Sequence, residues 1–319
     1  MTRPILLLVA AIALALPVSL LAGRVWIDPF HPALAAAPAI LLELRLPRGV
    51  LALIVGAGLG GAGAAMQGYL RNPLADPGLF GIAPGAALGA VLALLTGASA
   101  AFALPLAALI GAGSAMALLA LIAGRTAGVT LFTLAGMMIA SLAGALTSLA
   151  INLAPNPFAL SEIVTWLMGA LTDRGWPDVW IAAPPTLLGL AVLVWAGRDL
   201  DALTLGEDAA RSLGVEPRRV QALMIVGVGL TVGAGVAVAG IIGFVGLMVP
   251  HLVRRFTDRR PSQLIVPSAL AGALLVLVAD MLSRIMPLAG GELRLGIGLS
   301  LLGAPFFLML LLRMRRGLA

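Results

Sequence analysis

Apolar runs of about 20 residues follow one another along the whole chain, and only short charged segments separate them. A helix needs about 20 apolar residues to cross a bilayer, so this pattern restricts the chain to a polytopic membrane protein. The composition agrees, since 61% of the residues are hydrophobic, 11% are charged and the mean hydropathy is +1.09. No polar segment is long enough for a soluble domain. We therefore predict a single all-α transmembrane domain that spans residues 1–319.

The apolar runs predict ten transmembrane helices. Glycine and alanine are abundant in them, which favours a dense bundle because small residues let helix backbones approach closely in lipid. Between the fifth and sixth helices, 154–178 is predicted to be an external short helix whose tryptophans, including Trp166 and Trp176, lie at the membrane interface. The ten predicted helices are 5–22, 49–70, 83–95, 104–123, 130–153, 179–196, 220–239, 240–255, 262–282 and 293–312.

The arginines predict the orientation. All 20 basic residues are arginine, and this layout places fourteen of them on one side of the membrane. Because cytosolic loops carry the excess of positive charge, that side is predicted to be the cytosol, with both termini in it. The segment 24–46 then becomes external. The six arginines on the external side are Arg24, Arg45, Arg48, Arg174, Arg284 and Arg294.

Several kinds of chemistry are excluded. The chain has no cysteine, so it forms no disulfide and has no catalytic thiolate. It has no lysine, so it lacks the phosphate-binding loop that ends in Gly-Lys-Ser/Thr. The two histidines have no neighbouring glutamate, and the motifs of hydrolases are missing, which argues against a metal site, a cofactor and an enzyme. Topology, rather than nucleic-acid binding, explains the net charge of +6.

Two breaks interrupt the apolar pattern, one at 67–78 and one at 240–251, and both are rich in glycine and proline. Each follows the first helix of a set of four, and the two sets run in opposite directions, as in transporters built from two halves. In the first break, Asn72 and Asp76 could simply cap neighbouring helix ends. The alternative for Asn72 is a role in gating.

Two polar groups at the external side have competing interpretations. Arg45 and Arg48 could anchor a helix at the interface, or they could bind carboxylates of an external protein, because an arginine fork fits a carboxylate. Asp280 and Arg284 are four residues apart and are predicted to pair along one helix face, with Arg284 also able to reach the outer surface.

The most polar stretch, 198–219, is predicted to be cytosolic. Within it, 205–214 has the pattern of a short amphipathic helix that ends at a glycine. A plain surface loop is one interpretation. A cytosolic protein partner is the other, because an apolar side that includes Ala209 and Leu213 needs a partner in water.

Several motifs in order give the chain a resemblance to a known family, the permeases of type II ABC importers for ferric siderophores, haem and cobalamin. The resemblance covers nearly the whole chain. It departs from the family at Glu292–Gly296, where Arg294 replaces a proline, and at Gly240–Gly243. The motifs are Arg45-Leu-Pro-Arg48, Gln67 with Asn72-Pro-Leu-Ala-Asp-Pro-Gly78, Trp166–Gly169, Leu205-Gly-Glu207 through Leu213-Gly214, Gly243–Leu247 with Pro250-His251, Ala279-Asp280, and Gly303–Phe307.

The resemblance implies a multi-pass protein of the bacterial inner membrane that dimerises with a second copy of itself around a central path. It also implies two cytosolic ATP-binding subunits and one periplasmic substrate-binding protein. The implied residue roles are binding-protein docking for Arg45, Arg48, Arg284 and Arg294; a cytoplasmic gate at Asn72, Val129 and Thr130; a path lined by Met137, Met138, Ser141, Thr147 and Ser148; and ATPase coupling through Glu207, Asp208, Ala209, Arg211, Leu213 and Gly214.

The predicted function is thus import of haem, a ferric siderophore or cobalamin, with haem favoured, driven by ATP that a separate subunit hydrolyses. An ion-coupled secondary transporter is the alternative, and it needs a titratable group in mid-membrane, for which only Asp280 qualifies. A purely structural scaffold is a third option, which the two glycine- and proline-rich breaks disfavour.

Overall fold

The computed structural model describes residues 2–23, 26–28, 37–97, 102–124, 128–286 and 291–317. In these residues, eight helices are long and apolar enough to cross a membrane, and two shorter helices, α4 and α11, complete the predicted ten. The ten are α1 (Thr2–Leu21), α3 (Leu46–Tyr69), α4 (Ile82–Leu95), α5 (Ala103–Ala123), α6 (Val129–Asn152), α8 (Trp176–Leu203), α10 (Pro217–Ala239), α11 (Val245–Val253), α12 (Pro261–Ile285) and α13 (Leu295–Gly317). The short elements are α2 (Ala37–Ala39), η1 (Ile40–Arg45), η2 (Pro77–Phe80), α7 (Pro157–Leu167), α9 (Glu207–Ser212) and η3 (Arg254–Phe256).

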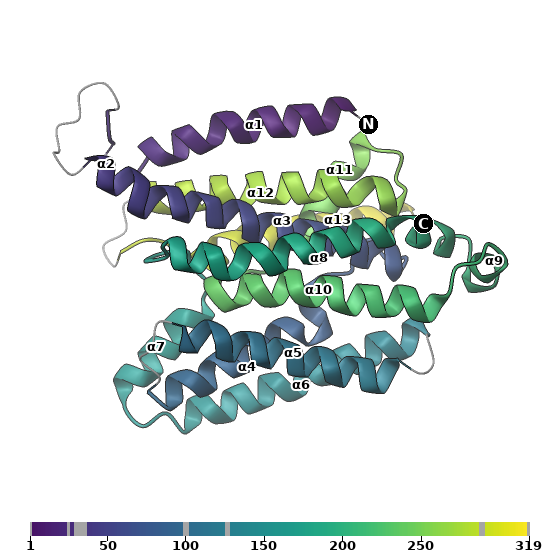
Figure 1. Ribbon diagram of the computed structural model, residues 1–319, viewed down its shortest axis with the longest axis horizontal. Helices are drawn as coiled ribbons and strands as arrows, with labels where there is room; N and C mark the ends of the chain where they lie inside the picture. Colours follow the sequence, from purple (N-terminus) through teal and green to yellow (C-terminus); the bar gives the residue numbers. More distant parts are fainter. Residues whose placement is uncertain are drawn as a thin grey trace.

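The helices run roughly side by side, with α3 and α10 inside the bundle (Figure 1). The most apolar windows of these two helices are 78% buried, whereas that of α1 is 6% buried and those of α6 and α13 are 28% buried. A helix that is apolar all round must be covered by protein or lipid, so α1, α6 and α13 present surfaces to the bilayer or to another subunit.

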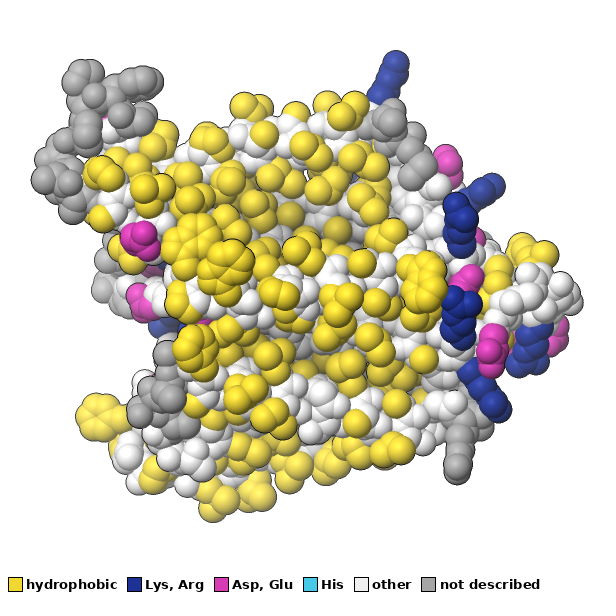
Figure 2. Space-filling view, in the orientation of Figure 1, with side chains coloured by type: hydrophobic (Ala, Val, Ile, Leu, Met, Phe, Trp, Pro, Cys, Tyr) yellow, Lys and Arg dark blue, Asp and Glu magenta, His cyan; other side chains and the backbone are white. Residues whose placement is uncertain are grey.

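Charged side chains collect at the two ends of the bundle, and hydrophobic ones cover its middle (Figure 2). The start of α1 and the end of α13 lie at the same end as α9 (Figure 1). We call this the inner end, because the arginine distribution assigns it to the cytosol. The predicted arrangement, with both termini on the side of the polar 198–219 segment, is confirmed. Arg24 and residues 29–36 lie outside the described residues.

The second transmembrane helix begins well before the predicted start at residue 49. Helices α2, η1 and α3 form one continuous helix from Ala37 to Tyr69, so the second half of the predicted external segment 24–46 is helical and continues directly into the membrane helix. Its external position stays a prediction. Pro47 has no N–H to donate and would normally break a helix. Here η1 is a wider π-helical turn, in which the N–H of Leu46 donates to the Leu41 carbonyl five residues earlier, and the helix continues into Pro47.

The segment between α6 and α8 contains the predicted external helix, α7. Two tryptophans of the predicted segment 154–178 lie in different surroundings. Trp176 donates from Nε1 to the Leu42 carbonyl at 3.1 Å, whereas Trp166 is buried against the main core. The interfacial prediction is therefore wrong for Trp166, because the chain after α7 turns back into the bundle and its Gly169 packs on the Ile241 carbonyl.

Helices α3 and α12 pack backbone to backbone at their glycines. A Cβ atom built on Gly56 would lie 2.3 Å from the Gly272 carbonyl oxygen, and one on Gly60 would lie 2.1 Å from the Ser268 carbonyl oxygen. Real Cβ atoms do not come so close to backbone oxygens, so only glycine allows this contact. In lipid, where the hydrophobic effect does not drive helices together, such close approach supplies the packing energy.

Candidate transport site

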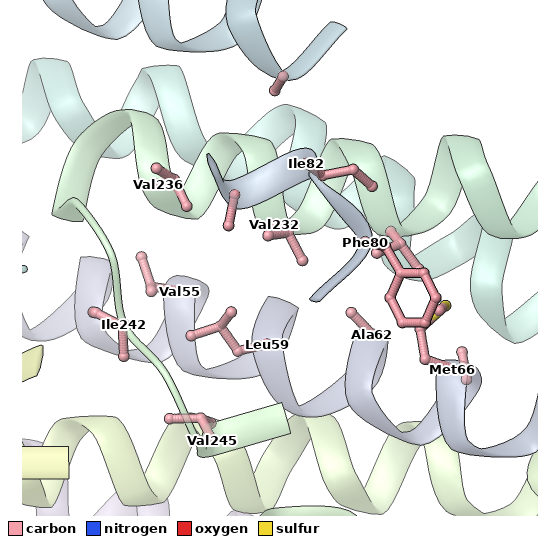
Figure 3. Packing of buried hydrophobic residues seen from close by; sticks show 14 of the residues in the cluster. Val55, Leu59, Ala62, Met66, Phe80, Ile82, Val232, Val236, Ile242 and Val245 are labelled. Carbon is pink, nitrogen blue, oxygen red and sulfur yellow. The ribbon is translucent and has the colours of Figure 1, made fainter. Parts of the chain in front are cut away.

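The two predicted breaks lie against each other inside the bundle. After α3 the chain turns through η2 into α4, and after α10 it runs extended from Gly240 into α11. Gly246 at the start of α11 fits between the two, since a Cβ there would lie 2.6 Å from Pro77 Cδ and 3.1 Å from the Leu59 carbonyl. Figure 3 shows the buried side chains of α3, α10 and the two breaks gathered in one cluster. The breaks therefore form one joint, although about 170 residues separate them.

Polar side chains hold this joint together. Gln67 Nε2 donates to the carbonyls of Gly246 and Leu247 at 3.3 Å, and Arg254 Nη2 donates to Gln67 Oε1 at 3.0 Å. A cavity of ≈110 Å³, lined by Asp76 and by residues of both breaks, lies beside it. These bonds satisfy carbonyls at the start of a helix that has only nine residues, and they fix α11 to the end of α3.

The predicted gate residues lie at the inner ends of α3 and α6. Asp76 Oδ1 accepts from the Gly78 N–H and caps the start of η2, so the predicted capping is confirmed for Asp76. It is wrong for Asn72, whose Oδ1 accepts from the Leu74 N–H in a local turn where no helix begins. The rings of Tyr69 and Phe132 lie 5.2 Å apart, edge to face, and bring the end of α3 to the first turn of α6. Val129 is half-buried and Thr130 is exposed in that turn. The geometry brings the elements of the predicted gate together, and the gating role stays a prediction.

The predicted path residues lie along α6. Met137, Met138, Ser141 and Ser148 are exposed and Thr147 is half-buried. Ser148 Oγ donates to the Gly144 carbonyl of its own helix, so this hydroxyl is already satisfied. The exposed side of α6 is therefore largely apolar, which suits a contact with lipid, with a second copy or with a bulky cargo. Lining of the path stays a prediction.

A buried ion-pair network occupies the outer end. Asp280 is completely buried on α12, accepts from Arg48 on α3 at 2.9 Å, and forms an ion pair with Arg284 one turn later at 3.2 Å. Arg48 also donates to Glu292, before α13, at 2.8 Å. The predicted pairing of Asp280 with Arg284 is confirmed. The sequence did not indicate that Arg48 would join them, because 232 residues separate it from Asp280.

Two of the predicted docking arginines hold the outer end of α1. Arg45 Nη1 donates to the carbonyls of Leu20 and Leu21 at 2.8 Å, and Arg284 donates to the Ala22 carbonyl and to Ser19 Oγ. The last carbonyls of a helix have no partner within it, and cations there also favour the helix dipole. The buried Arg284 does not reach the outer surface as predicted, because these acceptors hold its guanidinium inside.

The outer cluster still borders an open cavity. This cavity measures ≈380 Å³ and is lined by Arg45, Arg48, Arg174 and Arg284 together with Asp173 and Glu292, among others. Arg294, which is partly exposed, follows Glu292 before α13 begins. The outer mouth of this cavity therefore carries an excess of arginine over carboxylate, as a site for acidic groups would.

The inner segment forms the short helix that was predicted. Helix α9 begins after Gly206 and is followed by Gly214, and both glycines have a positive φ, of 105° and 82°. Arg211 pairs with Glu207 and Asp208 along the surface of the helix. Ala210 is buried, while Leu213 and Leu205 are 64% and 68% exposed. Both leucines line a groove of ≈560 Å³ that also includes Asp258–Pro261.

One link at the inner end was not predicted. Asp201, near the end of α8, accepts from the Ser262 N–H at 2.9 Å and from the Ser262 hydroxyl, and so caps the start of α12. The sequence predicts that a helix starts here, because a proline such as Pro261 is common at the first position of a helix. It does not predict the capping residue, which lies 61 positions away. These two bonds connect the end of α8 directly to the start of α12.

Residues 5–313, nearly the whole chain, match the family model of the FecCD transport family. The chain belongs to the FecCD transport family. An uncharacterised ABC transporter permease, YvrB of Bacillus subtilis, is 40% identical over 87% of this chain and 80% of its own length. The vitamin B12 import system permease BtuC of Salmonella typhimurium is 37% identical over 98% of this chain and 96% of its own.

Solved structures agree with this assignment. A structure described as a metal-chelate type ABC transporter in an inward-facing conformation superposes with a TM-score of 0.90 at 30% identity, and the match covers 98% of this chain and 100% of that one. PsaBC from Streptococcus pneumoniae shares the fold alone, with a TM-score of 0.53 at 18% identity. This FecCD family member is thus a multi-pass membrane permease of the ABC importer type, a transport subunit rather than an enzyme.

Proposed function

We propose that two copies of this chain form the membrane conduit of an ATP-driven importer for cobalamin or an iron chelate, either haem or a ferric siderophore. The relation to BtuC carries the proposal, because it extends over 98% of this chain and includes both breaks. The single transmembrane domain, 1–319, supplies the path. The apolar exposed sides of α6 and α13 are the surfaces that a second copy would cover, in a bacterial inner membrane.

Uptake into vesicles tests this function. The chain is reconstituted with its ATPase subunits and binding protein, and uptake of cobalamin, haem and a ferric siderophore is measured with and without ATP and with a protonophore. We expect uptake of one of these cargoes that requires ATP and the ATPase subunits and that persists with the protonophore. Uptake by the chain alone on an ion gradient would contradict the proposal.

The site geometry disfavours the alternative of an ion-coupled transporter. Such a transporter needs a mid-membrane carboxylate that can take up and release an ion. Asp280 is completely buried and already pairs with two arginines, so it has no vacant position for a coupling ion.

Helix α9 and the groove beside it are the surface that we propose for the ATPase subunits. Leu213→Asp replaces an exposed apolar side chain of this groove with a charge, and burying that charge against a partner would be costly. We expect ATP-dependent uptake to fall at least about tenfold, because burying an unpaired polar group costs at least about 1.4 kcal/mol. The matched control is Leu213→Met, which keeps the apolar contact and should transport normally. Normal uptake by the Asp variant would exclude Leu213 from the coupling surface.

The outer cavity, lined by Arg45, Arg48 and Arg284, is the surface that we propose for the binding protein, together with the partly exposed Arg294, which lies two residues after the lining residue Glu292. Reversing Arg48 would disturb its pairing with Asp280, so Arg294→Glu is the cleaner test. We expect an affinity for the binding protein about tenfold lower, mostly through slower association, and a weaker dependence on salt. Arg198→Glu, with the same charge change at the inner end, is the control. Equal affinity for both variants would remove Arg294 from the docking site.

A further inference from the structure

A second cationic cavity lies at the inner end, where α11 passes into η3. It measures ≈260 Å³, and its lining consists of His251, Arg254, Arg255 and Arg259. No carboxylate of the described residues lines it. The neighbouring Asp258 is exposed and lines the groove beside α9 instead. Three guanidinium groups around one small cavity repel one another unless an anion lies between them.

Three other groups of charged side chains among the described residues contain ion pairs. Arg48 and Arg284 share Asp280, Arg174 pairs with Asp178, and Arg211 pairs with Glu207 and Asp208. By contrast, Arg255 and Arg259 make no ion pair with any described residue. Burial lowers the pKa of Arg254, and the positive charge of Arg259 lowers it further.

His251 also has a polar atom without a hydrogen-bond partner among the described residues. Its ring packs edge to face on Phe306 of α13, with 5.8 Å between the ring centres. Its Nδ1 atom is buried and has no hydrogen-bond partner among the described residues. A buried ring nitrogen without a partner is unfavourable, and an oxygen of a bound anion in the cavity could bond to it.

Exposed apolar side chains lie beside the cations. Leu252 and Phe256 are 40% and 71% exposed. Residues three and four apart lie on one side of a helix, so Leu252, Arg255 and Phe256 share a side of the α11–η3 segment. An apolar surface next to cations at the cytosolic boundary fits a lipid, whose acyl chains contact the former and whose headgroup contacts the latter.

We propose that this cavity binds the phosphate group of an anionic phospholipid in the inner leaflet. Arg255 and Arg259 hold the phosphate oxygens, since a guanidinium matches phosphate in shape and charge. Arg254 contributes less, because it also donates to Gln67. Gln67 lies in the joint between the two breaks, so a lipid bound near Arg254 would be connected to this joint through the Arg254–Gln67 hydrogen bond. Lipid binding would therefore stabilise the packing of α11 against α3.

Lipid titration of the purified full chain, followed by native mass spectrometry, tests the proposal. The wild-type chain should bind phosphatidylglycerol more tightly than phosphatidylcholine. The double variant Arg255→Gln/Arg259→Gln should bind phosphatidylglycerol about tenfold to thirtyfold more weakly, because each basic residue near an anionic lipid contributes about 1 kcal/mol. The control Arg3→Gln/Arg198→Gln removes the same charge from exposed positions at the same end and should change the affinity less than about threefold.

Three results would overturn the proposal. Equal losses in the two double variants would show a general attraction of the inner surface for anions. Equal binding of the two lipids by the wild-type chain would show that no phosphate site for anionic lipid exists. Complete displacement of phosphatidylglycerol by millimolar inorganic phosphate would assign the cavity to free phosphate, because the acyl contacts with Leu252 and Phe256 would then contribute nothing.

Discussion

Replacing Asp280 with alanine is expected to destabilise the protein by about 3–5 kcal/mol, because it leaves Arg284 buried without a counter-charge and Arg48 with only Glu292. Removing one partner of a buried ion pair costs more than the pair contributes, since the remaining charge stays out of water. The loss should appear as a fall in the thermal midpoint of the purified protein on the order of 10 °C.

A second substitution separates loss of charge balance from loss of packing. In the double variant Asp280→Ala/Arg284→Met, Arg48 keeps Glu292 as its partner and no second arginine is left unpaired. The double variant should therefore be more stable than the sum of the two single changes predicts, by about 1–3 kcal/mol. Ser283→Ala, which removes only a hydroxyl that bonds to the Asp280 carbonyl, is the control for the helix itself. An unchanged midpoint in Asp280→Ala would contradict the structural role of this carboxylate.

The outer cluster illustrates how far the sequence predicts a site. Asp280 and Arg284 are four residues apart on one helix, so the period of the helix predicts their contact. Arg48 belongs to the same network, but nothing in the sequence relates it to α12, because that contact depends on how α3 packs against α12. Arg45 and Arg284 turn inward because they donate to the carbonyls at the end of α1, which have no partner within that helix. The sequence does not show which side chains will bond to such carbonyls.

The helices themselves were largely predictable, since hydrophobicity over about 20 residues is a strong signal. The errors fall where backbone geometry overrides composition. Pro47 marks a helix start by its chemistry, yet a π-helical turn lets the helix run from Ala37 through it. Glycine and proline predicted the two breaks, but not their contact at Gly246. A glycine permits a close backbone contact, but it does not identify the segment that makes the contact.

The contact between α3 and α12 gives the other large expected effect. Gly60→Leu places a side chain where the Cβ alone would lie 2.1 Å from the Ser268 carbonyl oxygen, and backbone cannot yield as a flexible side chain can. The two helices must move apart, and the contact of Gly56 with Gly272 is then lost as well. We expect a loss of about 3 kcal/mol or more, at the upper end for overpacked cores. It should appear as a lower thermal midpoint and a lower yield of folded protein in detergent.

Gly113→Leu on α5 is the matched control, because a Cβ at Gly113 would have no atom within 4 Å. It makes the same chemical change in the middle of a transmembrane helix, and it also removes a residue that is unfavourable in helices by about 1 kcal/mol. Its thermal midpoint should therefore be unchanged or slightly higher. If both leucine variants lost stability equally, the cause would be side-chain bulk in any apolar helix. A loss confined to Gly60→Leu would instead show that the close backbone contact between α3 and α12 stabilises the bundle. These two helices also carry Arg48 and Asp280, so the same contact positions the buried ion pair.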